Sequence, residues 1–154
     1  ADFLVICTNT MHKVAPQIEE HISIPLLHIA DATAETLIKD GVKTVGLLGT
    51  AFTMEQDFYK GRLKDKFDLD VVVPNKEDIK IVHDIIYNEL CLGVINQSSK
   101  ESYLRIIDDL VSQGASAVIL GCTEIAMLVD QSDTDVKLYD TTTIHAKKAV
   151  EKAL

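Results

Sequence analysis

Short apolar runs alternate along the chain with longer segments in which apolar residues recur every three or four positions. The runs predict strands that are buried on both faces, and the longer segments predict amphipathic helices. We expect strands at residues 3–7, 26–29, 44–49, 69–73, 117–120 and 137–140, and helices at residues 11–21, 31–40, 50–67, 76–92, 99–113 and 141–154. This alternation predicts an α/β fold with parallel-sheet, flavodoxin-like lobes and helices on both faces.

The charge of the chain narrows the classes of partner. There are 24 acidic and 15 basic residues, and the formal charge of −9 disfavours binding to nucleic acid or to an anionic membrane surface. No apolar run approaches the roughly 18 to 20 residues that a membrane span needs, and the first residues, Ala-Asp-Phe, do not resemble a secretory signal. We therefore expect a cytoplasmic protein with no nucleic-acid or membrane partner.

Two of the three cysteines stand in matching positions. Cys7 and Cys122 each end an apolar strand and each precede a threonine. Ligands of parallel α/β sheets bind beyond the carboxyl ends of the strands, so two such units could present their thiols to opposite sides of one small molecule. Cys91 lies within a predicted helix and is assigned to packing. None of the three belongs to a CxxC pair, which argues against a disulfide framework, a zinc ribbon or a redox pair.

Paired thiols can perform acid–base chemistry at a carbon centre. The thiolate of a cysteine near a helix N-terminus is favoured by the helix dipole and by backbone N–H donors. One thiolate can remove an α-proton from one face while the opposite thiol delivers a proton to the other face, which is racemisation. The alternative interpretation is that each cysteine is a small core residue, because free cysteine is often buried.

The most specific motifs are Cys-Thr-Asn-Thr-Met-His-Lys at residues 7–13, Leu-Gly-Thr at residues 48–50 followed by Thr53, and Gly-Cys-Thr-Glu-Ile at residues 121–125. They resemble the aspartate/glutamate racemase family, in particular its bacterial amino-acid racemase branch. The resemblance implies a pyridoxal-independent racemase of aspartate/glutamate type, without cofactor or metal, in which Cys7 and Cys122 are the acid/base pair. It also implies substrate contacts from Thr8, Asn9, Thr10, Thr50, Thr53, Thr123 and Glu124. Thr50 and Thr53 could equally be helix caps.

The chain departs from the family at its start. Family members begin with a strand, a Gly-rich turn and further βα units before the first Cys-Thr-Asn-Thr, so we expect this chain to start inside a longer sequence. The resemblance divides it into the remainder of a first lobe (1–41), a complete second lobe (42–140) and a C-terminal helix that packs back on the first lobe (141–154). An exposed sheet edge in the first lobe predicts a homodimer or other homo-oligomer. The alternative function is an inactive truncated fragment that self-associates and still binds a small carboxylate.

Three further interpretations concern charged and metal-binding residues. The side chain of an acidic substrate needs a cation or several donors, for which Lys13 and Arg62 are candidates. A metal site built from Cys7, His12, His28 and Cys122 is disfavoured, because the spacing is unlike any compact zinc signature. His28 and His145 are interpreted as structural rather than catalytic.

Overall fold

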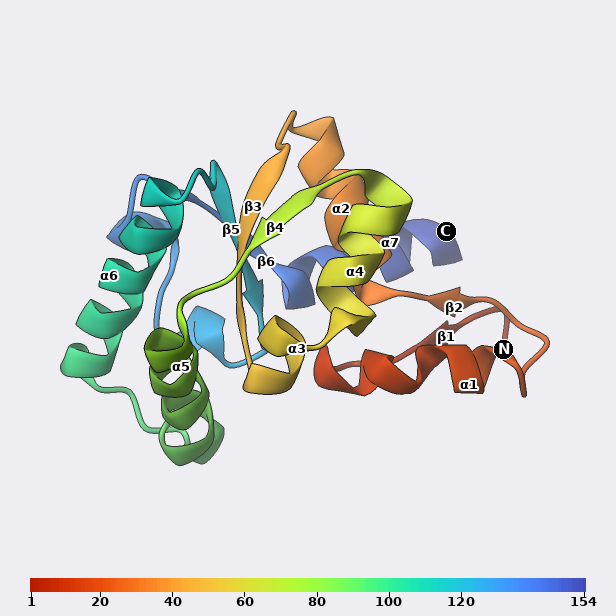
Figure 1. Cartoon of the computed structure of the whole chain (residues 1–154). Coiled ribbons are helices and arrows are strands. Elements are labelled where there is room, and N and C mark those ends of the chain that lie inside the picture. The colour runs from red at the N-terminus through yellow and green to blue at the C-terminus, as the bar shows by residue number, and fades with distance from the viewer.

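The computed structural model describes all 154 residues and has a four-stranded parallel sheet at its centre (Figure 1). Its strands lie in the order β4-β3-β5-β6 and comprise β3 (Thr44–Gly49), β4 (Asp70–Val72), β5 (Ala117–Gly121) and β6 (Lys137–Asp140). Each neighbouring pair is parallel, and Gly49 lies opposite Gly121 at the ends of the two central strands. The α/β class and the parallel sheet expected from the sequence are confirmed.

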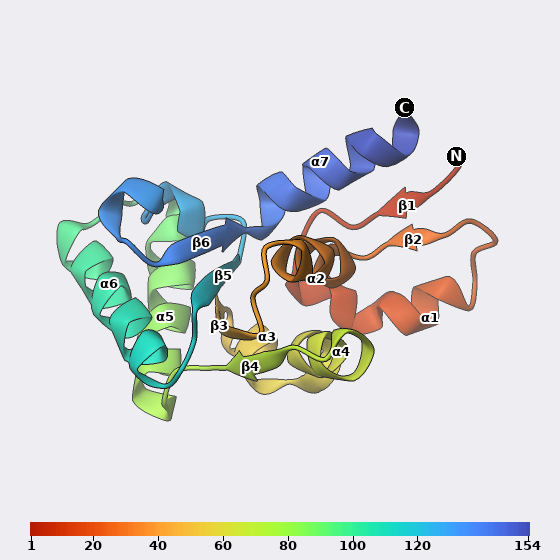
Figure 2. The same cartoon turned by 90° about the horizontal axis from the view of Figure 1, so that it is seen from above.

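Helices cover both faces of this sheet (Figures 1 and 2). One face carries α5 (Lys76–Asn88) and α6 (Gln97–Ser112), and the other carries α2 (Ile29–Lys39) and α4 (Asp57–Phe67). In β5, Val118 and Leu120 belong to the core under α5 and α6, whereas Ile119 belongs to the core under α2 and α4. The strand is apolar throughout because both of its faces are buried. None of the helices combines the length and the apolar character needed to cross a bilayer.

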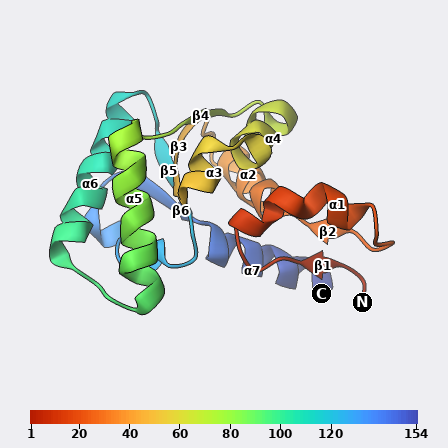
Figure 3. The same cartoon turned by 60° about the horizontal axis from the view of Figure 1, so that its bottom comes forward.

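A separate two-stranded parallel sheet contains β1 (Leu4–Val5) and β2 (Leu26–Leu27). The 3-10 turn η1 (Thr10–Val14) and the short helix α1 (Ala15–Glu19) lie between these strands along the chain. The C-terminal helix α7 (Thr141–Ala153) leaves β6 and runs beside α2 towards the small sheet. Both chain termini therefore lie at the same end of the molecule (Figures 2 and 3).

The start of α2 differs from the prediction. The helix begins at Ile29, whereas the sequence predicted a start at Asp31. Its cap is His28, whose ring Nδ1 accepts a hydrogen bond from the Ala30 N–H at 3.2 Å. Histidine is not among the preferred capping residues, so a search for Ser, Thr, Asp or Asn places the start too late.

Three predicted helices are shorter than expected. The helix expected at 11–21 forms the 3-10 turn η1 and the five-residue helix α1. Residues 50–67 form α3 (Ala51–Glu55) and α4 as separate helices, because Gln56 between them has an extended backbone with φ −83° and ψ 154°. The helix expected at 76–92 ends as α5 at Asn88 and is followed by the 3-10 turn η2 (Leu90–Leu92). The remaining 3-10 turns are η3 (Ile125–Met127) and η4 (Gln131–Asp133).

The two central strands approach each other closely at their carboxyl ends. A Cβ atom added to Gly121 would lie 2.7 Å from the Leu48 carbonyl oxygen, and one added to Gly49 would lie 2.9 Å from the Gly121 carbonyl oxygen. Both neighbours are backbone atoms of the sheet, which cannot rotate away as a side chain could. Glycine is therefore required where these strands end, immediately before Thr50 and Cys122.

We expect Gly121→Ala to lower the free energy of unfolding by about 1 to 3 kcal/mol, the usual cost of inserting a methyl group into a packed region. Urea denaturation measures this change. Gly61→Ala is the matched control, because its Cβ would meet only Asp57 Cβ, at 3.3 Å, within helix α4, where alanine is favoured over glycine by about 1 kcal/mol. Equal losses in the two variants would contradict the close approach of β3 and β5.

Three buried histidines pack together where η1, α2 and α7 meet. The ring centroid of His12 lies 4.4 Å from that of His28 and 5.9 Å from that of His145. His12 Nε2 accepts from the Ile29 N–H at 3.2 Å, so its Nδ1 carries the proton and donates to the Thr8 carbonyl at 2.7 Å. Burial is the main cause that lowers the pKa of His12 to about 4 and that of His28 to about 3, and it also lowers the pKa of His145. The cluster is therefore neutral at pH 7.

The free energy of unfolding should fall as the pH is lowered from 7 to 5. In this range the unfolded chain gains protons on His12 and His28 and the folded chain does not, so each of these two histidines lowers the free energy of unfolding by about 1 to 2 kcal/mol. Urea denaturation at several pH values measures the slope. His28→Asn keeps a side-chain acceptor at the cap of α2 and should make the slope shallower, whereas the same change at exposed His21 should not. Identical slopes in the two variants would contradict the prediction.

Candidate active site

Residues that follow β1, β3 and β5 line one open cavity of about 390 Å³. Eight of the nine residues that the sequence marks as catalytic or substrate-binding are in this lining: Cys7, Thr8, Asn9, Thr10, Thr50, Cys122, Thr123 and Glu124. The ninth, Thr53, is fully buried beside it, with its hydroxyl 3.3 Å from that of Thr50. The fold thus brings both Cys-Thr segments to one cavity although they lie far apart along the chain.

Asn9 connects the Cys7 segment to the larger sheet. Its side chain is 2% exposed, and its Nδ2 donates to the Thr141 hydroxyl at 3.0 Å. The Thr141 hydroxyl in turn donates to the Leu120 carbonyl at 2.9 Å, near the end of β5. The Asn9 Oδ1 atom is buried and has no donor. An unsatisfied buried acceptor is costly unless a ligand supplies a donor, so this atom is a candidate substrate contact.

Three threonines form a hydroxyl cluster that also joins the Cys7 segment to the end of β3. The Thr10 hydroxyl lies 3.1 Å from that of Thr50 and 3.4 Å from that of Thr53. Thr50 is also the cap of α3, because its hydroxyl accepts from the Thr53 N–H at 3.4 Å. For Thr50 the two interpretations of the sequence are therefore compatible, since the residue caps a helix and lines the cavity. Thr53 does not line the cavity and is connected to it only through the hydroxyls of Thr10 and Thr50.

Cys122 is held as a thiol by its surroundings. Its Sγ donates to the Glu124 carboxylate at 2.9 Å, and burial together with this carboxylate raises the pKa of Cys122 to about 12. Burial opposes the ionisation of Glu124, but hydrogen bonds from Cys122 and Thr123 lower its pKa. The expectation that a helix N-terminus favours the Cys122 thiolate is wrong. The following η3 has only three residues, so its dipole is too small to offset burial and an adjacent negative charge.

Cys91 is misassigned by the sequence pattern. It lies in η2, is exposed, and lines the same cavity as the other two cysteines. Burial of the thiol and the negative charge of Glu124 raise its pKa. The packing role assumed that α5 continues through this residue, but the helix ends before it. Gly93, in the left-handed region two residues later, is the signal that could have placed Cys91 in a surface turn.

The other cavity residues missed by the sequence analysis are Met11, Ile86, Tyr87 and Gly121. Three of their side chains are apolar or aromatic and come from η1 and α5. Ile86 and Tyr87 follow the helical pattern of α5, which predicts a buried face but does not show that its end reaches the cavity. The wall next to η2 is therefore less polar than the threonine-rich wall.

The two candidate cations do not line the cavity. Lys13 Nζ lies 5.6 Å from the centre of the Phe52 ring. Arg62 makes a bidentate ion pair with Asp31, with N–O distances of 2.5 and 2.9 Å. The residues considered for a metal site do not converge, since no three of the His, Cys, Asp and Glu side chains are placed to hold one ion.

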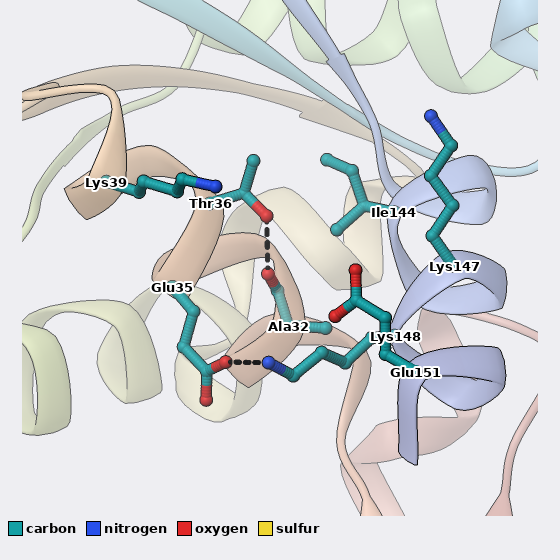
Figure 4. Close-up of a pocket in the computed structure, with 8 residues that line it drawn as sticks. All are labelled: Ala32, Glu35, Thr36, Lys39, Ile144, Lys147, Lys148 and Glu151. Carbon is teal, nitrogen blue, oxygen red and sulfur yellow. Dashed lines mark hydrogen bonds and ion pairs between the residues drawn. The ribbon is translucent and has the colours of Figure 1, made fainter. Parts of the chain in front are cut away.

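A second hollow of about 430 Å³ lies between α2 and α7 (Figure 4). Its walls carry charged side chains that partly neutralise one another, with Lys148 Nζ 2.6 Å from the Glu35 carboxylate. The Thr36 hydroxyl donates to the Ala32 carbonyl of its own helix. This groove contains no cysteine, so it lacks the paired thiols that line the first cavity.

Comparison with known proteins finds relatives that are named as racemases or racemase homologues. A crystal structure of a proposed Asp/Glu racemase from Yersinia pestis is 50% identical, with a TM-score of 0.95 over 99% of this chain and 66% of that chain. An aspartate racemase homologue from Pyrococcus horikoshii OT3 is 40% identical, with a TM-score of 0.88 over 99% of this chain and 67% of that chain. The broad specificity amino-acid racemase RacX of Bacillus subtilis is 22% identical over 99% of this chain and 65% of its own length.

The chain thus spans about two thirds of the length of these relatives. The sequence profile described as Asp/Glu/Hydantoin racemase matches residues 1–149, nearly the whole chain. With the parallel α/β fold and the paired Cys-Thr segments at one cavity, this match places the protein in the Asp/Glu/Hydantoin racemase family.

Proposed function

We propose that this chain forms the site of an amino-acid racemase that works without pyridoxal phosphate and uses Cys7 and Cys122 as its two acid–base groups. The observation that carries the proposal is that both thiols line one cavity although they follow strands of two different sheets. Membership of the racemase family, whose relatives here include proteins named as amino-acid and glutamate racemases, supports the reaction class. The substrate would be a small amino acid.

The environments of the two thiols suggest which of them removes the α-proton and which delivers a proton to the opposite face of Cα. With Cys122 protonated, the Cys7 thiolate removes the α-proton from one face of the substrate, and the Cys122 thiol delivers its proton to the opposite face. In the reverse direction the roles exchange. The Glu124 carboxylate accepts the S–H hydrogen bond of Cys122, so it favours the protonated thiol that donates in the first direction. Cα is inverted and no net proton is consumed.

The cavity also offers partners for the constant part of an amino acid. The unsatisfied Asn9 Oδ1 would accept a hydrogen bond from the α-ammonium group. Threonine hydroxyls from Thr8, Thr10, Thr50 and Thr123 would donate to the α-carboxylate. Donors on this carboxylate stabilise the charge that develops on it when the α-proton leaves, which lowers the barrier of the chemical step.

We propose a division into two lobes that face each other across this cavity. The first contains residues 1–41 together with helix 141–154, and the second contains residues 42–140. The bond from His145 Nε2 to the Leu27 carbonyl, at 2.8 Å, supports the placement of the C-terminal helix with the first lobe. Helix α2 packs on the larger sheet as well, so it lies at the junction of the two lobes.

The alternative function is an inactive fragment that self-associates. It is supported by the small sheet, whose two strands pair only with each other and leave their outer edges open to a second copy. A homodimer formed in this way could also be the active form. Sedimentation of the purified chain, combined with the exchange assay below, separates the two, because a dimer without exchange supports the fragment and a dimer with exchange supports the enzyme.

Cys7→Ser and Cys122→Ser should each reduce the exchange of the substrate α-proton with solvent deuterium by about 100- to 10,000-fold, because an alcohol is a far weaker acid than a thiol. Mass spectrometry or proton NMR of the amino acid in D₂O measures this rate. Met127→Ser is the control, since Met127 is exposed outside the cavity. Exchange within twofold of the unmodified chain in both cysteine variants would rule out the two-thiol mechanism. Absence of exchange in the unmodified chain, with recovery after extension at the N-terminus, would favour the fragment.

Glu124→Gln should lower the pKa of Cys122, because it removes the negative charge that opposes the thiolate, while burial continues to raise the pKa. Each unit of decrease gives about tenfold more thiolate at a pH below the pKa. The rate of iodoacetamide alkylation of the Cys122 peptide, followed by mass spectrometry across pH, measures the change. Alkylation of Cys7 in the same sample is the internal reference. An unchanged or higher inflection for Cys122 would contradict the coupling to Glu124.

A further inference from the structure

Among the residues of this chain, the cavity lining offers no cationic partner for a substrate side chain. Its lining contains no lysine, arginine or histidine. Glu124 is the only acidic residue in the lining, and its lowered pKa keeps it ionised at neutral pH. A substrate side-chain carboxylate that enters the cavity would therefore meet the negative charge of Glu124 and no positive charge. Its removal from water is disfavoured as a result.

The basic residues considered for this role are engaged elsewhere. Arg62 and Lys66 both bind the Asp31 carboxylate, with Lys66 Nζ at 2.5 Å from Oδ2. Lys13 lies over the Phe52 ring. The histidines behind the Cys7 segment are buried and neutral, and their ring nitrogens bond to backbone groups. The cavity receives no positive charge from these groups by direct contact.

Cys91 occupies the wall where a substrate side chain would lie. The threonine-rich wall and Asn9 are the polar groups suited to the α-carboxylate and α-ammonium, which leaves Met11 and the residues from α5 and η2 for the side chain. That wall presents the Cys91 thiol with the side chains of Met11, Ile86 and Tyr87. Met11 and Ile86 have no ionisable group, the pKa of the Cys91 thiol is raised, and the thiol and the phenol can each donate or accept a hydrogen bond.

We propose that Cys91 contacts the substrate side chain and that the site built by this chain favours amino acids with uncharged side chains over those with a side-chain carboxylate. The inference rests on the proposed racemase function, since it assumes that Cα lies between Cys7 and Cys122. It assigns Cys91 a role in specificity and none in proton transfer.

Two pairs of amino acids test this preference with shape held constant. L-asparagine and L-aspartate, and L-glutamine and L-glutamate, differ in the charge of one terminal group. Binding is measured by the concentration of each amino acid that protects the Cys122 peptide from iodoacetamide, and turnover by deuterium exchange at Cα. We expect the amide member of each pair to protect at a concentration at least about tenfold lower than the acid member, the effect of roughly one unpaired charged group.

Cys91→Lys supplies the missing cation and should reverse the order within each pair, by about tenfold or more in favour of the acid. Leu92→Lys is the matched control, because it adds the same charge one position along, at a side chain that is 72% exposed and outside the cavity lining. It should leave the amide-to-acid ratio within about twofold of the unmodified chain. Tight protection by the acids in the unmodified chain, no reversal in Cys91→Lys, or no protection by any of the four would overturn the inference.

The two readouts separate this inference from the proposed function. Protection that follows the expected order without any deuterium exchange would support the side-chain preference and count against the racemase. Exchange with a preference for the acids would support the racemase and overturn the role of Cys91.

Discussion

The candidate site depends on the hydrogen bonds that fasten the Cys7 segment to the end of the larger sheet. Asn9 Nδ2 donates to Thr141, and Thr141 donates to the Leu120 carbonyl, two residues before Cys122. The two-stranded sheet that carries Cys7 has no ladder bonds to the four-stranded sheet that carries Cys122. This buried relay, together with the bonds from Thr10 to Thr50 and Thr53, sets the position of one thiol relative to the other. One buried atom of the relay, Asn9 Oδ1, has no donor.

The same arrangement explains why the two thiols differ. Cys122 follows a strand buried on both faces and donates to the Glu124 carboxylate, so burial and charge both favour its protonated form. Cys7 is exposed and has no such partner. The proposed two-thiol mechanism needs a protonated thiol on one side of the substrate, and the surroundings of Cys122 suit that role. A cavity that already holds one carboxylate also accommodates a neutral substrate side chain more readily than an anionic one.

The sequence predicted those features that local pattern determines. Strands 44–49 and 137–140 coincide with β3 and β6, because apolar runs between turn residues suffice to specify buried strands. The His28 cap and the break at Gln56 depend on tertiary contacts and backbone geometry that no periodicity reveals. The two Cys-Thr segments were placed at strand ends by the pattern, whereas the position of Cys91 depended on the residue at which α5 stops. The raised pKa of Cys122 arises from burial, which spacing alone does not determine.

The two halves of the site are held in place by different interactions, so one half can be displaced while the other stays in position. The Cys122 half rests on β3 and β5, whose backbones meet so closely that glycine is required at both ends. The Cys7 half rests on side-chain hydrogen bonds and on His12, which joins the Thr8 carbonyl to the first turn of α2. Protonation of His12 and His28 removes hydrogen-bond acceptors from the Cys7 half. The sheet contacts of the Cys122 half stay intact. Because the pKa of His12 is lowered to about 4 and that of His28 to about 3, a pH near or below these values should displace Cys7 before the central sheet unfolds, so that the site and the fold are lost in separate events.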